Sequence, residues 1–177
     1  RRLPRFAGQT FVQWFKARGG SSPVDAEHGD AVLFPDTFTN YNHPELGRAA
    51  VKVLEGLGFR VVVPSVRCCG RPMLSKGMLE KARRNARHNV DRVYPYIERG
   101  AKLVGLEPSC ILSFRDEYVD LLDGDPKARA VQVSTMLVEE FVLYAAEEHG
   151  AQIKTNGSPG KLLLHGHCHQ KALVGTD

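Results

Sequence analysis

The fold is decided by residues 31–70, which read AVLFPDTFTNYNHPELGRAAVKVLEGLGFRVVVPSVRCCG. The apolar run 31–34 ends at a Pro-Asp pair, as expected for a strand buried in a parallel sheet. A helix should follow over residues 44–57, because apolar side chains recur there at the i, i+3, i+4 spacing and a glycine comes next. Residues 59–63 form a second apolar run. The stretch therefore predicts a strand, a helix and a second strand that leads into Cys68-Cys69-Gly70.

The remainder of the chain repeats this alternation. Helical periodicity marks residues 79–97, 111–122 and 133–144, and apolar runs that predict strands occupy residues 101–106 and 161–164. Strands that alternate with helices pack as a sheet covered by helices. We therefore predict an α/β fold, a layered domain with a mostly parallel sheet flanked by helices. Ligands of such sheets bind at the carboxyl ends of the strands.

A lead-in precedes the first strand. Residues 11, 14 and 15 are aromatic and share one face of a short predicted helix, and a Gly-Ser-rich stretch follows at residues 19–23. These aromatic residues could dock on the domain or on a neighbouring protein, and we favour docking on the domain.

Composition limits the class of protein. The chain has 177 residues, of which 42% are hydrophobic and 25% charged, so it is too apolar for a disordered chain and long enough for one globular domain. No apolar run approaches the ~18 residues that a membrane-spanning helix needs. Four cysteines, two of them adjacent, favour reduced thiols in a cytoplasmic setting over a disulfide scaffold. Because the chain begins at Arg1 without an initiator methionine, we expect it to be a piece of a larger protein.

The net charge of +4 suits acidic partners without requiring nucleic acid. Basic residues gather between Lys76 and Arg92, but a complete apolar stripe runs along the same helix, so they are best explained as a solvated face. Neither GxxxxGK nor GxGxxG occurs in the sequence. We therefore expect no nucleic-acid partner and no nucleotide bound by this chain itself.

Every cysteine follows a predicted strand: Cys68 and Cys69 the second, Cys110 the third and Cys168 the last. Three loops should therefore bring thiols to one edge of the sheet. Thiolates are soft ligands for iron and zinc, and a helix N-terminus stabilises their anionic form. Cysteines are also common as small buried hydrophobic residues, although a Cys-Cys-Gly turn is less typical of that role. The pattern favours a metal or iron–sulfur site.

Three ordered motifs resemble a known family. They are Asn40-Tyr41-Asn42-His43-Pro44-Glu45-Leu46-Gly47, Cys68-Cys69-Gly70-Arg71-Pro72 and Glu107-Pro108-Ser109-Cys110. Together they are similar to the cysteine-rich CCG domain of iron–sulfur oxidoreductases. That family includes iron–sulfur proteins of glycolate oxidase and of anaerobic glycerol-3-phosphate dehydrogenase, heterodisulfide reductase B-like proteins and FAD-linked D-lactate dehydrogenase-like proteins. The resemblance covers about residues 30–177.

The resemblance implies a division of the chain and a set of ligands. Residues 1–29 would be a helical lead-in and linker, 30–160 a first CCG-type repeat and 161–177 the start of a truncated second repeat. The implied ligands of an iron–sulfur cluster are Cys68, Cys69, Cys110 and Cys168. Two further cysteine positions of the family are occupied by Thr37, 31 residues before Cys68, and by Glu107, three residues before Cys110. A cluster in the first repeat would therefore rely on three thiols, helped by Glu107 or Asp36.

Histidines accompany the last cysteine. In an extended segment His165, His167 and His169 would share one side and Cys168 the other. Imidazole and thiolate are both zinc ligands, so a zinc ion bound by Cys168 and His167 is one hypothesis. The other is a strand end at which a residue such as His165 orients a loop or a substrate.

Arg71 follows the Cys-Cys-Gly turn directly. Its guanidinium group could bind a substrate carboxylate through a two-pronged contact, or it could be a solvated turn residue. The sequence leaves both roles open.

Two functions also remain open. The resemblance implies part of an iron–sulfur, FAD-linked oxidoreductase that passes electrons from a small 2-hydroxy acid, of the lactate or glycolate type, to a quinone or cytochrome. FAD would be held by a flavin domain or flavoprotein subunit outside this chain. The protein would be cytoplasmic or peripheral at the inner face of the membrane, and the chain alone would be inactive. The alternative is a cluster-free CCG-like scaffold or docking module that could bind zinc.

Overall fold

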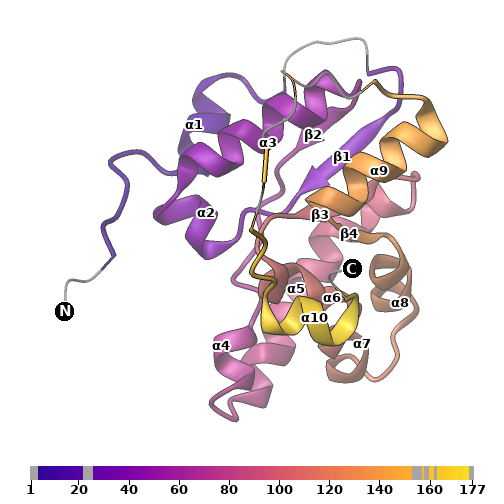
Figure 1. Ribbon diagram of the computed structural model, residues 1–177. Helices are drawn as coiled ribbons and strands as arrows, with labels where there is room; N and C mark the ends of the chain where they lie inside the picture. The colour runs from indigo at the N-terminus through magenta and orange to yellow at the C-terminus, as the bar shows by residue number, and fades with distance from the viewer. Residues whose placement is uncertain (1–3, 22–25, 153–156, 158–159, 162, 176–177) are drawn as a thin grey trace.

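The computed structural model describes residues 4–21, 26–152, 157, 160–161 and 163–175. In this part of the chain four strands form one parallel sheet in the order β2-β1-β3-β4 (Figure 1). Their bounds are Asp30–Leu33 for β1, Arg60–Val62 for β2, Lys102–Gly105 for β3 and Thr135–Leu137 for β4. The α/β layered fold predicted from the sequence is confirmed.

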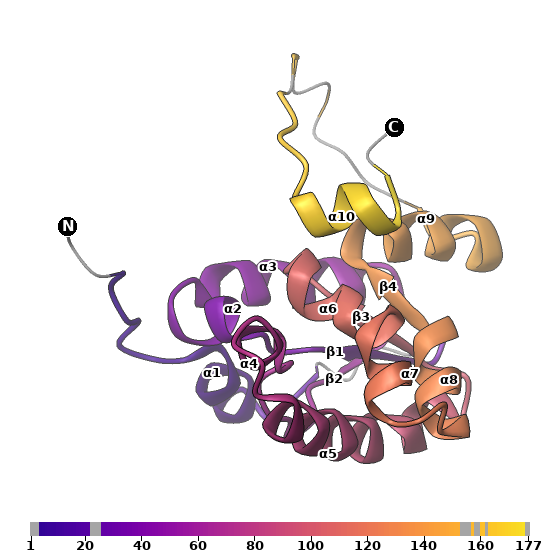
Figure 2. The same ribbon diagram turned by 90° about the horizontal axis from the view of Figure 1, so that it is seen from below.

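Helices cover both faces of the sheet. Figure 2 shows α5 on one side of it and α3 and α9 on the other. Within the described residues no helix is long and apolar enough to cross a membrane. The helices are α1 (Phe11–Ala17), α2 (Thr37–Tyr41), α3 (Pro44–Gly56), α4 (Arg71–Leu74), α5 (Leu79–Ile97), α6 (Pro108–Arg115), α7 (Glu117–Leu121), α8 (Pro126–Val133), α9 (Val138–His149) and α10 (Cys168–Leu173).

The core consists of two layers because neighbouring residues of a strand point to opposite faces of the sheet. Val32 and Leu103 belong to the layer formed with α5, α6 and α8. Leu33 and Val104 belong to the layer formed with α1, α3 and α9. Both faces of the strands are therefore buried, which explains why the strands are apolar at successive positions rather than at alternate ones.

The aromatic lead-in helix α1 docks on the domain, as expected. Phe11 and Phe15 are buried, and Trp14 packs against the same layer. A Cβ atom added at Gly47 of α3 would lie 2.6 Å from the Phe11 ring. The absence of a side chain at Gly47 therefore lets this ring lie directly against α3.

The predicted helix that starts at residue 133 is confirmed from Val138 onwards as α9, but its first part is wrong, because residues 135–137 form the fourth strand. Helix α8 ends at Val133, β4 pairs with β3, and α9 starts only at Val138. The backbone of β4 is aligned by the pairs Leu103–Thr135 and Gly105–Leu137. Three residues are too few to show the alternating apolar pattern of a strand in the sequence. Whether they form a strand depends on pairing with β3, which is distant in the chain.

The predicted strand over residues 161–164 is also wrong for the part that the structure describes. Residues 161, 163 and 164 lie outside the sheet, and residue 162 lies outside the described residues. Leu163 is 97% exposed. An apolar run becomes a strand only where a sheet pairs with it, and the place beside β3 is taken by β4.

The predicted helix over residues 111–122 consists of two helices. Helices α6 and α7 meet at Asp116, whose φ of −116° and ψ of −88° are not helical. The junction turns the chain, so that the Asp116 side chain and the start of α7 lie next to α10. Apolar periodicity continues across this junction in the sequence, and it therefore gave no signal of the break.

Candidate functional site

Three loops that follow parallel strands meet at the carboxyl edge of the sheet. The chain places β2 on one side of β1 and β3 on the other, so the strand order reverses beside β1. The loops carry Asp36 and Thr37 after β1, Cys68 and Cys69 after β2, and residues 107–110 after β3. Such a reversal opens a crevice at the strand ends, where α/β sheets hold their ligands.

Three thiols form a short row in this crevice. The Cys69 thiol donates a hydrogen bond to Sγ of Cys110 over 3.2 Å. The Cys68 thiol interacts with the Cys69 side chain and with the side chain of Thr37. Cys69 and Cys110 are buried, and Cys68 is half-buried. The structure thus brings together three of the four predicted cysteine ligands and places Thr37 beside them.

A cleft of about 520 Å³ leads to the exposed end of this row. Its walls come from α1, α2 and the loop 63–68, and both Thr37 and Cys68 line it. Solvent or a partner can therefore reach Cys68 directly, whereas Cys69 and Cys110 lie behind it in the core.

Two buried polar side chains hold the cysteine loop in place. The Tyr118 hydroxyl donates a hydrogen bond to the carbonyl of Cys69 over 2.8 Å. Asn89 donates to the Tyr118 hydroxyl over 3.0 Å and also accepts from the backbone N–H of Arg67 over 2.7 Å. Sequence reasoning missed both residues. Asn89 could have been found, because it is a polar residue within the apolar stripe of α5.

Gly70 allows the cysteine loop to turn into α4. Its φ of +92° lies in a region that residues with a side chain rarely adopt. A Cβ atom at this position would also lie 3.4 Å from the Cα atom of Ala82 in α5. The third residue of the Cys-Cys-Gly motif is therefore required by backbone geometry.

Two carboxylates lie beside the thiols, each as a helix cap. Oε2 of Glu107 accepts a hydrogen bond from the backbone N–H of Cys110 over 2.6 Å. Oδ1 of Asp36 accepts one from the N–H of Thr39 over 2.9 Å, while Oδ2 is buried without a hydrogen-bond partner. Burial raises the pKa of Asp36, against the opposing effect of the Thr39 hydrogen bonds, and the nearby charge of Glu107 raises it further.

The thiols themselves are strongly disfavoured as anions. The hydrogen bond to Cys110 raises the pKa of Cys69 to about 12, and burial adds to this effect. The hydrogen bond to Cys69, together with burial, raises the pKa of Cys68. The Cys69 hydrogen bond lowers the pKa of Cys110, but burial and the charge of Glu107 raise it by more. Without a cation the row is therefore protonated at neutral pH.

The residues fit a thiolate-bound metal group in part. Two thiolates with bonds of ~2.3 Å to one ion lie ~3.8 Å apart, so Cys69 and Cys110 need to move little. Among the described residues, no ion pair joins a lysine or arginine to Asp36 or Glu107, so a bound cation would meet uncompensated acidic groups. In the same residues, however, no three ligand atoms of these loops lie within 4.8 Å of one another. A row of this kind suits a cluster of several metal ions better than a single ion.

Arg71 is not a free turn residue. It starts α4 and forms an ion pair with Glu117, the first residue of α7. One carboxylate of the protein itself therefore already engages the guanidinium group that the sequence offered to a substrate carboxylate.

The histidines do not have the predicted extended arrangement. Cys168 starts α10 and is exposed, and His165 is exposed in the segment before it. His167 caps α10, with Nε2 3.8 Å from Oε1 of Glu107. His169 lies inside the helix and is buried. The helix turns the side chains to different sides, so the structure does not bring Cys168 to the buried thiols.

A parallel α/β sheet with thiols at its switch point defines a class of domain that presents cysteines at strand ends. Residues 34–115 match the family model described as CCG, cysteine-rich domain. The match begins just after β1 and ends with α6, so it contains Thr37, the Cys-Cys-Gly turn and Cys110. No solved structure matches the chain.

Several curated proteins are similar along most of the chain. A subunit of the anaerobic glycerol-3-phosphate dehydrogenase of Escherichia coli is 29% identical over 179 residues, which cover 99% of this chain and 44% of that protein. Lactate utilization protein A of Exiguobacterium is 29% identical over 84% of this chain and 60% of its own length. The D-2-hydroxyglutarate dehydrogenase of Pantoea ananatis is 30% identical over 82% of this chain and 14% of its own length. The chain thus spans less than two thirds of each of these relatives.

Proposed function

We propose that this chain is the electron-transfer part of an iron–sulfur, FAD-linked oxidoreductase that oxidises a small 2-hydroxy acid and passes the electrons to a quinone or cytochrome. The observation that carries this proposal is the row of Cys68, Cys69 and Cys110 beside two carboxylates at the switch point of the sheet. The division of the chain into two CCG-type repeats belongs to the same proposal. Two of the relatives are named for lactate and for D-2-hydroxyglutarate, and both compounds are 2-hydroxy acids.

In this proposal the three cysteines supply part of the ligands of a cluster, and an iron–sulfur cluster supplies one-electron transfer when it is bound. The burial of Cys69 and Cys110 excludes water from the inner side of the site. Tyr118 and Asn89 fix the backbone that carries the thiols, so that electron transfer requires little rearrangement. Glu107 and Asp36 lie beside the thiols and add negative charge, which lowers the reduction potential of a neighbouring cluster.

The residues do not include a flavin-binding motif of the GxGxxG type, so the flavin would be held by a partner protein or domain. Hydride would leave the hydroxy acid there and electrons would reach the cluster one at a time. The cleft in front of Cys68 is the open approach to the thiols among the described residues, and we assign it to the electron-transfer partner.

The test uses the full-length protein, purified anaerobically together with any flavoprotein that remains bound. Iron, acid-labile sulfide and flavin are quantified, and D-lactate, glycolate or D-2-hydroxyglutarate is then added. We expect flavin bleaching followed by the EPR signal of a reduced cluster. Cys69→Ser should abolish that signal, whereas Glu147→Gln, a change at an exposed residue of α9 outside the cleft, should retain it. A preparation with neither iron nor flavin would reject the proposal.

A cluster-free scaffold is the second candidate, and one observation favours it. Thr37 and Glu107 stand at two positions where the resemblance implies cysteines, and Glu107 serves as a helix cap instead. In that case, the anaerobic preparation would contain zinc or no metal, and Cys69→Ser would reduce stability without changing any spectrum.

A further inference from the structure

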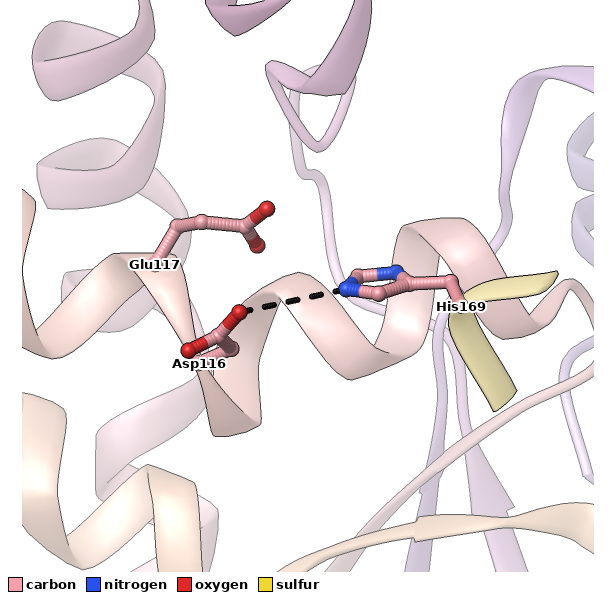
Figure 3. A group of neighbouring side chains, drawn as sticks. All are labelled: Asp116, Glu117 and His169. Atoms are coloured by element: carbon pink, nitrogen blue, oxygen red, sulfur yellow. Dashed lines mark ion pairs between the residues drawn. The ribbon is translucent and has the colours of Figure 1, made fainter. Parts of the chain in front are cut away.

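A second group of potential ligands lies outside the row of thiols. It consists of Asp116 at the junction of α6 and α7, Glu117 at the start of α7, and His169 in α10 (Figure 3). One ligand atom of each residue lies within 4.8 Å of the other two. Segments that are about fifty residues apart in the chain supply this group, and the packing of α10 on α6 brings them together.

His169 is buried without a hydrogen-bond partner. Its side chain is only 9% exposed, and neither Nδ1 nor Nε2 has a partner among the described residues. Nε2 lies 3.9 Å from Oδ2 of Asp116, too far for a hydrogen bond, and Figure 3 shows the ring directed at that carboxylate. A buried polar group without a partner costs on the order of 1–3 kcal/mol in stability. A ligand bound to the His169 ring would remove this cost.

Glu117 leaves a second buried atom without a partner. One oxygen, Oε1, forms the ion pair with Arg71, whereas Oε2 is buried and has no hydrogen-bond partner. The group therefore presents a buried imidazole and one buried carboxylate oxygen, both without a hydrogen-bond partner, and the half-exposed carboxylate of Asp116. These are an imidazole nitrogen and two carboxylate oxygens, the donor types that divalent first-row metals accept.

We propose that Asp116, Glu117 and His169 bind one divalent first-row metal ion, of the Mn²⁺, Fe²⁺ or Zn²⁺ class. Bonds of ~2.0–2.2 Å bring ligand atoms to ~3 Å from one another, so ligand atoms that now lie within 4.8 Å of one another need to close by less than about 2 Å. Three protein ligands leave at least one position for water. The two carboxylate charges match the charge of a divalent ion, and Arg71 adds one further positive charge beside Glu117.

The proposed ion would clamp α10 onto the junction of α6 and α7. The proposed ligand Glu117 forms an ion pair with Arg71, and Arg71 directly follows Gly70. The ion would therefore also be linked, through these residues, to the turn that carries the thiols. Ion binding should therefore raise the thermal stability of the chain, because only the folded state brings the three ligands together.

This site differs from the zinc site that the sequence predicted around Cys168. Of the four residues weighed there, only His169 belongs to the present group, and the exposed Cys168 and His165 do not. Thiols are therefore not needed for binding, and the two sites can be separated by the choice of metal and variant.

Mn²⁺ alone is the probe, because it prefers oxygen and nitrogen ligands and binds thiols weakly. The 177-residue chain without a histidine tag is titrated with MnCl₂ while the EPR signal of free Mn²⁺ is recorded, and the melting temperature is measured in parallel. We expect one Mn²⁺ per chain, displaced by Zn²⁺, and a higher melting temperature with the metal.

Asp116→Asn and His169→Gln should weaken Mn²⁺ binding by more than about tenfold, the loss that even an outer-shell partner can cause. Asp120→Asn removes the same charge from an exposed position on α7 and should leave binding unchanged. Because Asp116 is half-exposed, its variant should fold even if His169→Gln does not. Absence of Mn²⁺ binding by the folded chain at millimolar metal, or equal binding by Asp116→Asn, would overturn the proposal. Binding that is lost only in Cys168→Ala would reject it as well.

Discussion

The Sγ atoms of Cys69 and Cys110 lie 3.2 Å apart although 41 residues separate the two cysteines in the chain. Their strands, β2 and β3, do not pair with each other, because β1 lies between them. The contact is therefore made by loops that bend over the end of β1, where the strand order reverses. Any change that moves one of these loops should disturb both thiols.

Replacement of Asn89 by alanine should loosen the cysteine loop. The change removes hydrogen bonds to the backbone of Arg67 and to the Tyr118 hydroxyl, all of them in a buried setting. We expect a loss of about 2 kcal/mol in the free energy of unfolding, measured by urea denaturation. Tyr118→Phe removes one hydroxyl and should cost less. Equal stability of Asn89→Ala and the wild type would show that the loop is held by other contacts.

Replacement of Gly70 by alanine should destabilise the chain by about 1–2 kcal/mol or more, because a Cβ atom is disfavoured at a positive φ. Gly77 is the matched control: its φ is +68°, and an added Cβ would meet open space. Gly70→Ala should be the more harmful of the two, since its φ of +92° is less accessible and Ala82 lies 3.4 Å away. The comparison uses urea denaturation, and a larger loss for Gly77→Ala would contradict this account.

The Arg87–Asp125 ion pair between α5 and the start of α8 should make the free energy of unfolding depend on pH in the acidic range. The hydrogen bond from Arg87 lowers the pKa of Asp125 from 3.8, and that from the N–H of Lys127 lowers it further. Because the folded pKa lies below the unfolded one, the contribution is fully present above about pH 4 and is lost as the pH falls through the folded pKa. Asp125→Asn should therefore be less stable than the wild type at pH 7, and the difference should shrink in strong acid. A difference that does not vary with pH would contradict the linkage.

The four thiols should react with iodoacetamide in a defined order. Cys168 is exposed, Cys68 is half-buried, and Cys69 and Cys110 are buried. The pKa of Cys69, raised to about 12 by its hydrogen bond to Cys110, further slows its reaction, since the thiolate is the reactive form. Peptide mass spectrometry at pH 8 should show Cys168 modified first and Cys69 and Cys110 only after unfolding. Early modification of Cys69 would place it outside the core.

The chain by itself should remain colourless after anaerobic incubation with iron and sulfide. Its site offers three thiols in a row, fewer than the four cysteines that usually hold a cluster. The double variant Thr37→Cys, Glu107→Cys restores cysteine at the two positions that the resemblance implies and should gain iron and a brown colour. Iron and sulfide assays provide the measurement, and a stable cluster in the unmodified chain would show that three thiols with acidic neighbours suffice.

Much of the site could be predicted because it depends on local order. A strand that ends at a Cys-Cys-Gly turn must deliver its thiols to the carboxyl edge of a parallel sheet, whichever helices cover that sheet. The family resemblance implied that Asp36 or Glu107 lies beside them. The strand prediction is wrong at the C-terminus, where apolar residues 161–164 looked like a strand but, as far as they are described, have no partner in the sheet. The prediction that the three histidines share one side of an extended segment is also wrong, because His169 lies in helix α10.

Residue type and spacing alone were enough to predict the alternation of strands and helices, the turn at Gly70 and the chemistry of the strand ends. Three other features became visible only in the folded chain: Thr135–Leu137 is a strand, Tyr118 supports the thiols, and Asp116, Glu117 and His169 meet. Each of these depends on a partner far away in the chain. The free energy of such a contact appears only when packing brings the partners together, and no local pattern of residues records it.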